Sequence, residues 1–99
     1  MSIGAPLKPF VEVTLVDYDF IDLLWTEPWS AVTIKNYTIE ILNSEGVALR
    51  TEHVKAPADS YRVLNLLGNT QYSFRIRANS DAGQGTWSDL VNEQTAETS

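Results

Sequence analysis

The chain contains no cysteine, so disulfide bonds, thiolate metal sites and a cysteine nucleophile are excluded. Its single histidine, His53, has no serine or acid at a recognisable catalytic spacing. No apolar run approaches the roughly 18 residues of a membrane helix, and the N-terminus lacks the basic-then-apolar pattern of a secretion signal. We therefore expect no enzyme, no metal or other cofactor and no membrane insertion by this chain, and its compartment stays open.

Positive charge is also scarce, because 7 basic residues stand against 13 acidic ones and give a formal net charge of −6. That balance disfavours phosphate backbones and anionic membranes, so nucleic acid is not an expected partner. With 99 residues and 43% hydrophobic content, the chain has the size and composition of one folded domain. A filled domain of this size leaves little room for a cleft, which argues against a small-molecule substrate.

Apolar and polar residues alternate in short segments, and no segment has a long apolar stripe at helical spacing. Two segments between the strands carry loop signals, a turn at residues 43–46 and a glycine-containing loop at residues 79–85. Seven short antiparallel strands in about 100 residues indicate an all-β, immunoglobulin-like two-sheet sandwich. The predicted strands cover residues 11–16, 21–25, 37–41, 47–51, 61–63, 72–78 and 90–95.

The ends of the chain are assigned as linkers, with residues 1–8 as an N-terminal lead-in, 9–95 as the domain and 96–99 as a C-terminal linker. Pro6-Leu7-Lys8-Pro9 fits two interpretations. It is a stiff extended lead-in to the domain, which we favour, or a P-x-x-P ligand of an SH3 domain.

The chain resembles the fibronectin type III family over residues 6–95, including the glycine-containing segment at residues 79–88, and three other segments carry the match in detail. Residues 21–28 alternate apolar side chains and end in Trp25 and Pro28, and residues 34–40 centre on Tyr37. Residues 66–78 look like the tyrosine corner of the family, with Leu66 six positions before Tyr72. The resemblance implies a seven-stranded sandwich of fibronectin type III topology, with Trp25 in the core and the Tyr72 hydroxyl bound to nearby backbone.

The same resemblance implies a function. Members of this family are mostly non-catalytic protein-interaction or adhesion modules within multidomain receptors, matrix or scaffold proteins. The alternative is a spacer or accessory domain attached to an extracellular enzyme. Either implies another protein or a neighbouring domain as the partner, and an extracellular or cell-surface location. Some members bind through the loop before the last strand, which makes Asp81 and Gln84 candidate contacts here, although the Arg-Gly-Asp tripeptide is absent.

Residues that break the inside-outside alternation predict a binding face. If Trp25 and its alternating partners point inward, then Phe20 and Leu24 point outward, and Leu64 does the same on the fifth strand. These strands are neighbours in the family, so Phe20, Leu24 and Leu64 are predicted to form one exposed apolar patch, which tends to mark an interface. The alternatives are that long charged side chains cover the patch or that a bulge turns part of it inward.

Three further features have two interpretations each. Asn36 begins an N-glycosylation sequon, Asn36-Tyr37-Thr38, and the alternative is chance. Asp17, Asp19 and Asp22 suggest a calcium site, but without the glycine and glutamate of a calcium loop we favour a solvated acidic edge. Arg75 and Arg77 point away from the core, where they either stack on Trp87 or stay solvated.

Overall fold

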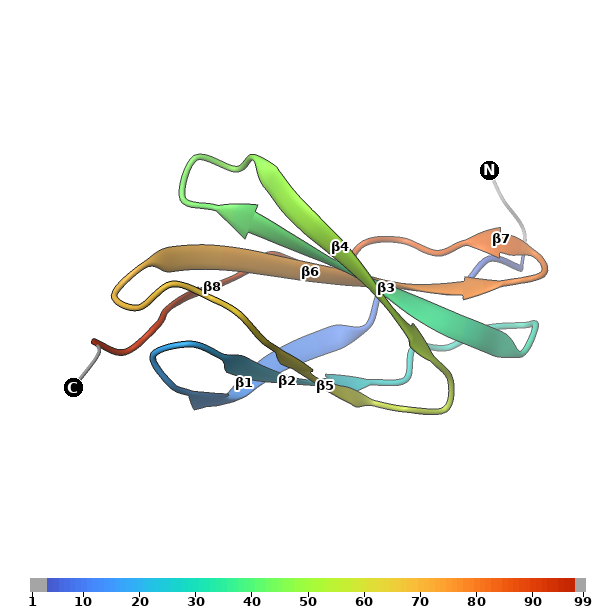
Figure 1. The fold of residues 1–99 in the computed structure, drawn as a ribbon. Helices are drawn as coiled ribbons and strands as arrows, with labels where there is room; N and C mark the ends of the chain where they lie inside the picture. The colour runs from blue at the N-terminus through green and yellow to red at the C-terminus, as the bar shows by residue number, and fades with distance from the viewer. Residues whose placement is uncertain (1–3, 98–99) are drawn as a thin grey trace.

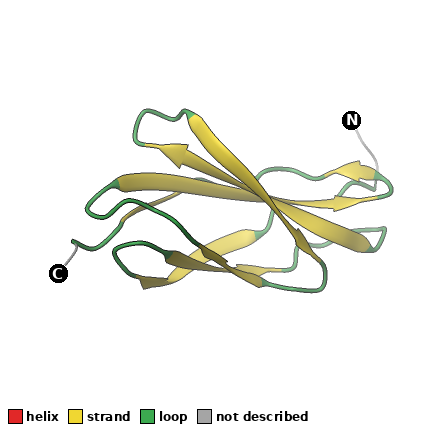
Figure 2. Cartoon of the chain, in the orientation of Figure 1, coloured by secondary structure: helices red, strands yellow, loops and turns green. Residues whose placement is uncertain are grey.

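The protein is described by a computed structural model over residues 4–97, and that part of the chain consists of strands and loops (Figure 2). Among these residues no helix is long and apolar enough to cross a membrane. The strands are β1 (Phe10–Val16), β2 (Ile21–Thr26), β3 (Ile34–Asn43), β4 (Ala48–Lys55), β5 (Ser60–Val63), β6 (Gln71–Ser80), β7 (Gly83–Gln84) and β8 (Val91–Gln94).

The strands form two antiparallel sheets that pack face to face (Figure 1). One sheet has the order β1-β2-β5, and the other has the order β4-β3-β6, with β7 and β8 pairing along β6. This arrangement confirms the predicted immunoglobulin-like sandwich. The short strand β7 was not predicted and lies inside the expected loop at residues 79–85, where Gly83 and Gln84 pair with the end of β6. The chain enters at one end of the sandwich and leaves at the other (Figure 1).

Most observed strands differ in their bounds from the predicted ones, and two strands show a local reason for irregularity. β4 runs past the predicted end at Thr51 to Lys55, because it stays paired with β3 as far as Asn36. β1 contains a bulge between Val13 and Leu15. The extra residue explains why Val13 and Val16 stand three positions apart instead of two, since a bulge absorbs one residue without reversing the faces.

The core lies between the sheets and is filled by alternating residues of the longest strands. Trp25 of β2 is only 2% exposed, and its ring centroid lies 5.2 Å from that of Tyr37 on β3, so this contact joins the two sheets. The prediction that Trp25 is a core residue is confirmed. The other apolar core residues are Val11, Ile21, Leu23, Ile34, Ile39, Ile41, Val63, Leu66, Tyr72, Phe74, Ile76 and Ala78.

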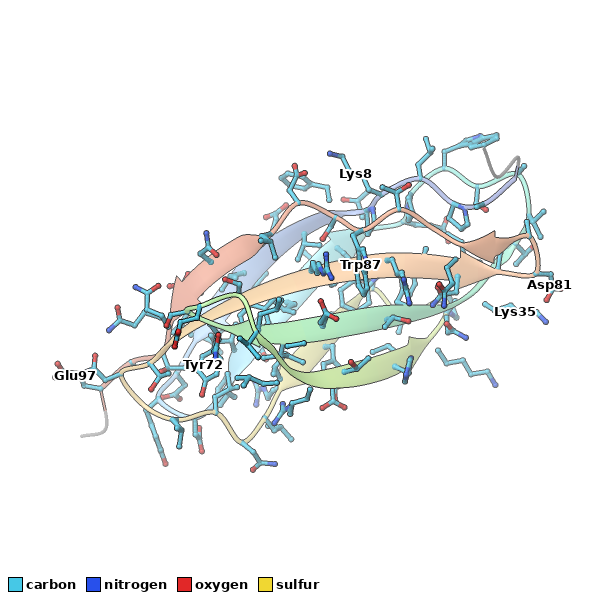
Figure 3. The ribbon with its side chains drawn as sticks, turned by 90° about the horizontal axis from the view of Figure 1, so that it is seen from above. Lys8, Lys35, Tyr72, Asp81, Trp87 and Glu97 are labelled. Atoms are coloured by element: carbon cyan, nitrogen blue, oxygen red, sulfur yellow. The ribbon has the colours of Figure 1, made fainter. Side chains whose placement is uncertain are left out.

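Tyr72 fills the end of the core that lies farthest from the β6-β7 hairpin (Figure 3). Its hydroxyl oxygen accepts a hydrogen bond of 2.9 Å from the backbone N–H of Leu67, as the tyrosine-corner resemblance predicts. Leu66, the residue before that donor, is buried in the core. The tyrosine thus fixes the crossing from β5 to β6 by packing and by one directed hydrogen bond.

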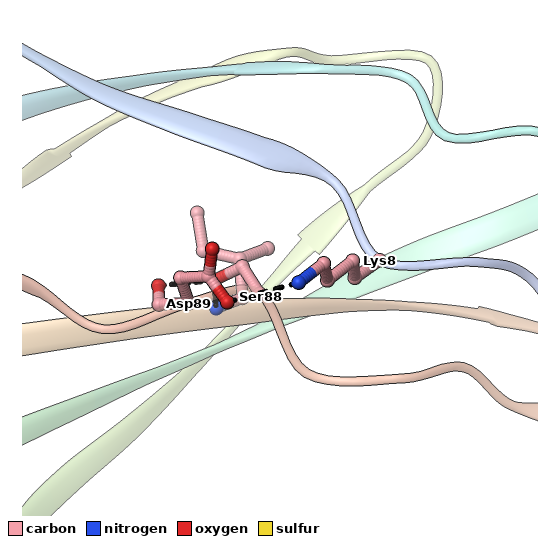
Figure 4. Close-up of polar contacts among 4 residues, drawn as sticks. Lys8, Ser88 and Asp89 are labelled. Atoms are coloured by element: carbon pink, nitrogen blue, oxygen red, sulfur yellow. Dashed lines mark hydrogen bonds and ion pairs between the residues drawn. The ribbon is translucent and has the colours of Figure 1, made fainter.

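The N-terminal segment before β1 packs against the domain. The Pro6 carbonyl accepts a hydrogen bond of 3.2 Å from Thr86, and the Lys8 ammonium lies 3.0 Å from the Asp89 carboxylate (Figure 4). Gly85 fits under this segment because a Cβ there would lie 2.7 Å from the Pro6 carbonyl oxygen. Pro6 and Pro9 are both buried. An SH3 domain requires accessible prolines, so the P-x-x-P interpretation is wrong for this fold.

Trp25→Ala should destabilise the domain by about 3–5 kcal/mol, because it leaves a large cavity at the contact between the sheets. Domains of this size commonly have a free energy of unfolding of about 5–15 kcal/mol, so chemical denaturation should show a marginally stable protein. Trp29→Ala is the matched control, since Trp29 is 66% exposed, and it should change stability by no more than about 0.5 kcal/mol. Equal losses in the two variants would contradict the core role of Trp25.

Tyr72→Phe should lower the free energy of unfolding by about 1–3 kcal/mol, because the Leu67 N–H then loses its acceptor in a partly buried site. The ring stays in place, so the fold is retained. Urea denaturation midpoints measure the change. Tyr18→Phe is the control, since Tyr18 is exposed, and a Tyr72→Phe midpoint equal to that of the control would remove the corner interpretation.

Candidate functional site

The outer face of the β1-β2-β5 sheet carries the residues predicted to bind a partner. Strand pairing sets Glu12 opposite Leu24, Asp22 opposite Arg62 and Leu24 opposite Ser60. These residues alternate with the buried side chains of the same strands, so they point away from the core. We call this surface the outer face.

An ion pair divides the predicted apolar patch. Arg62 donates two hydrogen bonds, of 2.8 and 3.0 Å, to the two carboxylate oxygens of Asp22, and its guanidinium lies 4.0 Å from the Phe20 ring centroid. Phe20 is therefore half-buried under a charged side chain, one of the alternatives considered from the sequence. Leu64 is 52% exposed. The Asp22–Arg62 pair occupies the positions between Leu64 and Leu24, so the patch is not continuous.

The ion pair sets the protonation of its members. Hydrogen bonds from Arg62 hold the pKa of Asp22 below its usual range, against a smaller opposing effect of burial. The same hydrogen bonds raise the pKa of Arg62. Both groups thus remain charged at neutral pH, and the pair acts as a fixed polar boundary across the outer face.

Leu24 has an apolar neighbour that the sequence analysis missed. Phe10, at the start of β1, is 67% exposed and pairs with Thr26, while Leu24 is 37% exposed and pairs with Glu12. Phe10 and Leu24 therefore occupy diagonal outward positions about 7–8 Å apart, within reach of an aromatic side chain. The signal was present in the sequence, because Phe10 stands one residue before Val11 in the alternation of the first strand.

A hollow of about 450 Å³ opens beside Leu24 at the end of β2. It is lined by Trp25 and Tyr37, which are almost fully buried, and by three exposed acidic residues, Glu12, Glu27 and Asp59. We call it the acidic notch, and it is completed by Leu24, Thr26 and Pro57.

The acidic notch has a negative potential at Tyr37. Burial raises the pKa of Tyr37, and the Glu27 carboxylate raises it further, while a hydrogen bond from the Trp25 indole lowers it. The indole Nε1 of Trp25 is fully buried, and its contact with the Tyr37 hydroxyl falls outside normal hydrogen-bond geometry.

The β6-β7 hairpin holds the other predicted contacts, at the far end of the molecule from Tyr72 (Figure 3). Asp81 is exposed at its tip, where its carboxylate lies 2.8 Å from the Lys35 ammonium. Gln84 is exposed on β7 opposite Asn79. The hairpin therefore presents polar groups, and the structure does not join them to Phe20, Leu24 or Leu64.

Comparison with known proteins agrees with this geometry. Residues 5–94 match the family model of the fibronectin type III domain. The chain belongs to the fibronectin type III domain family.

This fibronectin type III domain spans a small part of the curated relative that it matches. The chain is 28% identical over 92 residues to a tyrosine-protein phosphatase Lar-like from Caenorhabditis elegans, covering 93% of this chain and 4% of the relative. It is 33% identical to domains A168–A170 of titin, with a TM-score of 0.83, covering 94% of this chain and 33% of that one. It is 26% identical to the sixth fibronectin type III domain of the human fibronectin type III domain containing protein 3, with a TM-score of 0.82, covering 100% and 92%.

On the sheet of β3 and β6 of this fibronectin type III domain, the side chains that face away from the core contact one another. The guanidinium carbons of Arg75 and Arg77 lie 4.4 and 4.3 Å from the ring centroid of Trp87, which is labelled in Figure 3. The stacked arrangement expected as one of two alternatives is therefore the one present. Arg75 also donates to the Glu40 carboxylate at 2.7 Å. Arg75 thus contacts both Trp87 and Glu40, whereas Arg77 Nε and Asn79 Oδ1 on the same surface have no hydrogen-bond partner among the described residues.

The glycosylation sequon lies on the same sheet. The Asn79 side chain donates to the Asn36 oxygen at 2.7 Å and to the Thr38 hydroxyl at 2.8 Å. Asn36 is half-exposed, and its glycosylation stays a prediction.

Candidate metal and catalytic groups do not assemble in this fibronectin type III domain. Asp17, Asp19 and Asp22 form no cluster that could hold a metal ion, and within residues 4–97 no group of three or more histidine or acidic side chains does. His53 is exposed, and its Nδ1 lies 3.4 Å from the Thr38 hydroxyl.

Asp22→Asn should lower stability at neutral pH and have no effect in strong acid. The folded-state pKa of Asp22 is depressed, so its stabilisation is present above the unfolded pKa, about pH 4, and is lost as the pH falls through the folded pKa. Urea midpoints of parent and variant should differ at pH 7 and converge as the pH falls through the depressed folded-state pKa of Asp22. Glu45→Gln is the control, because Glu45 lies on an exposed turn. A difference for Asp22→Asn that is independent of pH would contradict the ion-pair assignment.

Proposed function

We propose that this fibronectin type III domain is a non-catalytic protein-interaction module of a longer chain and that it binds through the outer face around Phe10 and Leu24. The observation that carries the proposal is the pair of large apolar side chains held outward on adjacent strands. Strand positions that face water are usually polar, and contiguous exposed apolar surface tends to mark an interface. Buried aromatic anchors commonly carry much of the binding energy of an interface.

The remaining predicted contacts take secondary roles in this proposal. Phe20 and Leu64 lie beyond the Asp22–Arg62 pair and form a second, smaller contact region on the same face. Asp81 and Gln84 lie on the β6-β7 hairpin and are available to a partner that approaches that end of the sandwich. The expected partner is another protein or a neighbouring domain of the same chain. An extracellular or cell-surface location is proposed from the family alone.

The second candidate function is a spacer that positions other domains. It is supported by the small share of the Lar-like phosphatase that the similar region occupies, 4% of its length. A spacer needs a stable fold and suitably placed termini, but it does not need an exposed apolar pair on the face of a sheet. The two functions therefore predict different results when that pair is removed.

The combined substitution Phe10→Thr and Leu24→Thr should abolish partner binding and leave the fold intact, because threonine suits a strand and removes the apolar surface. Proteins crosslinked to the parent domain are compared with those crosslinked to the variant by quantitative mass spectrometry. Each partner lost in the variant is then purified, and its affinity is measured by calorimetry. We expect at least a tenfold loss, since truncation of a central aromatic anchor commonly costs that much or more.

Leu67→Thr and Leu90→Thr are matched controls, because both leucines are at least as exposed as Leu24 and neither lies on the outer face. Circular dichroism and urea midpoints verify that all variants are folded. If the full-length protein binds its partners equally well with and without the Phe10 and Leu24 substitutions, the binding role of this face is wrong and the spacer function is favoured.

A further inference from the structure

We infer that one end of the sandwich is a docking surface for the domain that precedes this one in the longer chain. The surface consists of Leu7, Trp29 and Val32, and we call it the entry surface. The inference goes beyond the proposed function, because it uses none of the residues of the outer face. It rests on that proposal only for the statement that this domain is part of a longer chain.

Trp29 is the most exposed of the three tryptophans. Its side chain is 66% exposed, whereas Trp25 is buried in the core and Trp87 is half-buried beside two arginines. Tryptophan is highly buried on average, because its ring carries a large apolar area. A single exposed leucine means little, but tryptophan is among the residue types most enriched at binding hot spots. Trp29 is therefore a candidate anchor for a contact outside the outer face.

Two further apolar side chains adjoin Trp29. Val32 is 37% exposed and lines a hollow of about 520 Å³ together with Trp29. Leu7 is 55% exposed, and its backbone N–H donates a hydrogen bond of 3.0 Å to the Trp29 carbonyl. Interfaces between domains of one chain commonly bury about 600–1,500 Å² in total, which is about 300 Å² from each domain at the lower limit. Three large side chains exposed to this degree supply much of that area.

The loop that carries Trp29 is held in place by its own domain. Pro28 is buried, and the Ser30 hydroxyl donates a hydrogen bond to the Val32 carbonyl. The hydrogen bond from Leu7 to the Trp29 carbonyl attaches the loop at a further point. An anchor on a fixed backbone loses little conformational freedom when it binds, so more of its apolar contact contributes to affinity.

The N-terminal segment brings the preceding chain to the entry surface. Pro6 and Pro9 are buried, and the Pro6 carbonyl accepts a hydrogen bond from Thr86, so this segment is fixed against the domain. Gly4, where the described chain begins, lies between the loop and the β6-β7 hairpin. A Cβ added there would lie 4.0 Å from a methyl group of Val32. Any domain attached through this segment therefore starts next to the entry surface.

Covalent attachment favours the preceding domain over a free protein as the occupant. A short linker gives its neighbour an effective concentration in the millimolar range, so even a weak contact is occupied. A second copy of this chain is disfavoured, because each copy carries a formal net charge of −6. Attachment at two points, the fixed N-terminal segment and Trp29, would also hold the two domains in one relative orientation, which a single flexible linker does not do.

The test compares the full-length protein with the 99-residue chain by hydroxyl-radical footprinting. Trp29 should be oxidised about fivefold or more slowly in the full-length protein, because the core of an interface excludes water. Trp87 is the internal reference and should react equally in both samples. Chemical crosslinks from Lys35, an exposed residue directly after this loop, should reach the preceding domain.

Three results of this comparison would overturn the inference. The first is equal oxidation of Trp29 in the two samples. The second is a set of crosslinks that joins Lys35 to another protein or to a different domain in place of the preceding one. The third is protection of Trp29 in the 99-residue chain that increases with protein concentration, since that dependence identifies a second copy as the occupant.

Trp29→Ala separates docking from folding. In the 99-residue chain it should change the hydrogen-exchange rates of the core strands by no more than about twofold, since the side chain is exposed. In the full-length protein it should raise them about fivefold or more, because a docked neighbour stabilises the folded domain. Leu90→Ala is the matched control, since Leu90 is exposed and adjoins β8, which pairs with the other end of β6. Equal effects of Trp29→Ala in the two samples would contradict docking.

The outcome is distinguishable from that of the proposed function. If Trp29 is covered in the full-length protein while no partner depends on Phe10 and Leu24, the entry surface stands and the proposed interaction face is wrong. If partners depend on Phe10 and Leu24 while Trp29 reacts as it does in the 99-residue chain, the interaction face stands and the docked neighbour is wrong.

Discussion

The contact between Trp25 and Tyr37 is the constraint on which the rest of the molecule depends. It joins β2 of one sheet to β3 of the other, with ring centroids 5.2 Å apart. Side chains alternate along a strand, so the inward position of Trp25 forces Leu24 outward, and a slip of one residue would bury Asp22 and expel Ile21 and Leu23. The core therefore determines both the register of the sheet and which side chains are exposed on its other face.

Much of the fold follows from local patterns, because apolar and polar residues alternate wherever a strand has one buried face and one exposed face. The inward residues of β2, β3 and β6, together with the Tyr72 corner, were predictable for that reason. β7 was not, since its pairing depends on two residues that carry no alternation. The site was less predictable. Arg62 is far from Phe20 in the chain, and only strand pairing shows that it covers that ring.

The acidic notch could not be predicted from the sequence for a related reason. Its acidic residues come from three separate segments: Glu12 from β1, Glu27 from the position after β2, and Asp59 from the turn before β5. No motif spans them, and each is an ordinary acidic residue in its own segment. They meet because antiparallel pairing brings the start of β1, the end of β2 and the start of β5 to one end of the sheet.

The distribution of satisfied charges distinguishes the possible interfaces of the sandwich. On the sheet of β3 and β6, Trp87, Arg75 and Glu40 satisfy one another, so a partner there would have to break existing contacts.

The free edge of β4 is also protected. Arg50 and Glu52 are half-buried on the inward side of this strand and lie 3.3 Å from each other. Arg50 also donates to the Leu64 carbonyl at 2.8 Å. Inward-pointing charges on an edge strand oppose the addition of another strand, because pairing would desolvate them further. The outer face of β1-β2-β5 differs from both surfaces, since it combines exposed apolar side chains with carboxylates that have no partner within the described chain. Association there removes apolar surface from water and pairs free charges without breaking an internal contact.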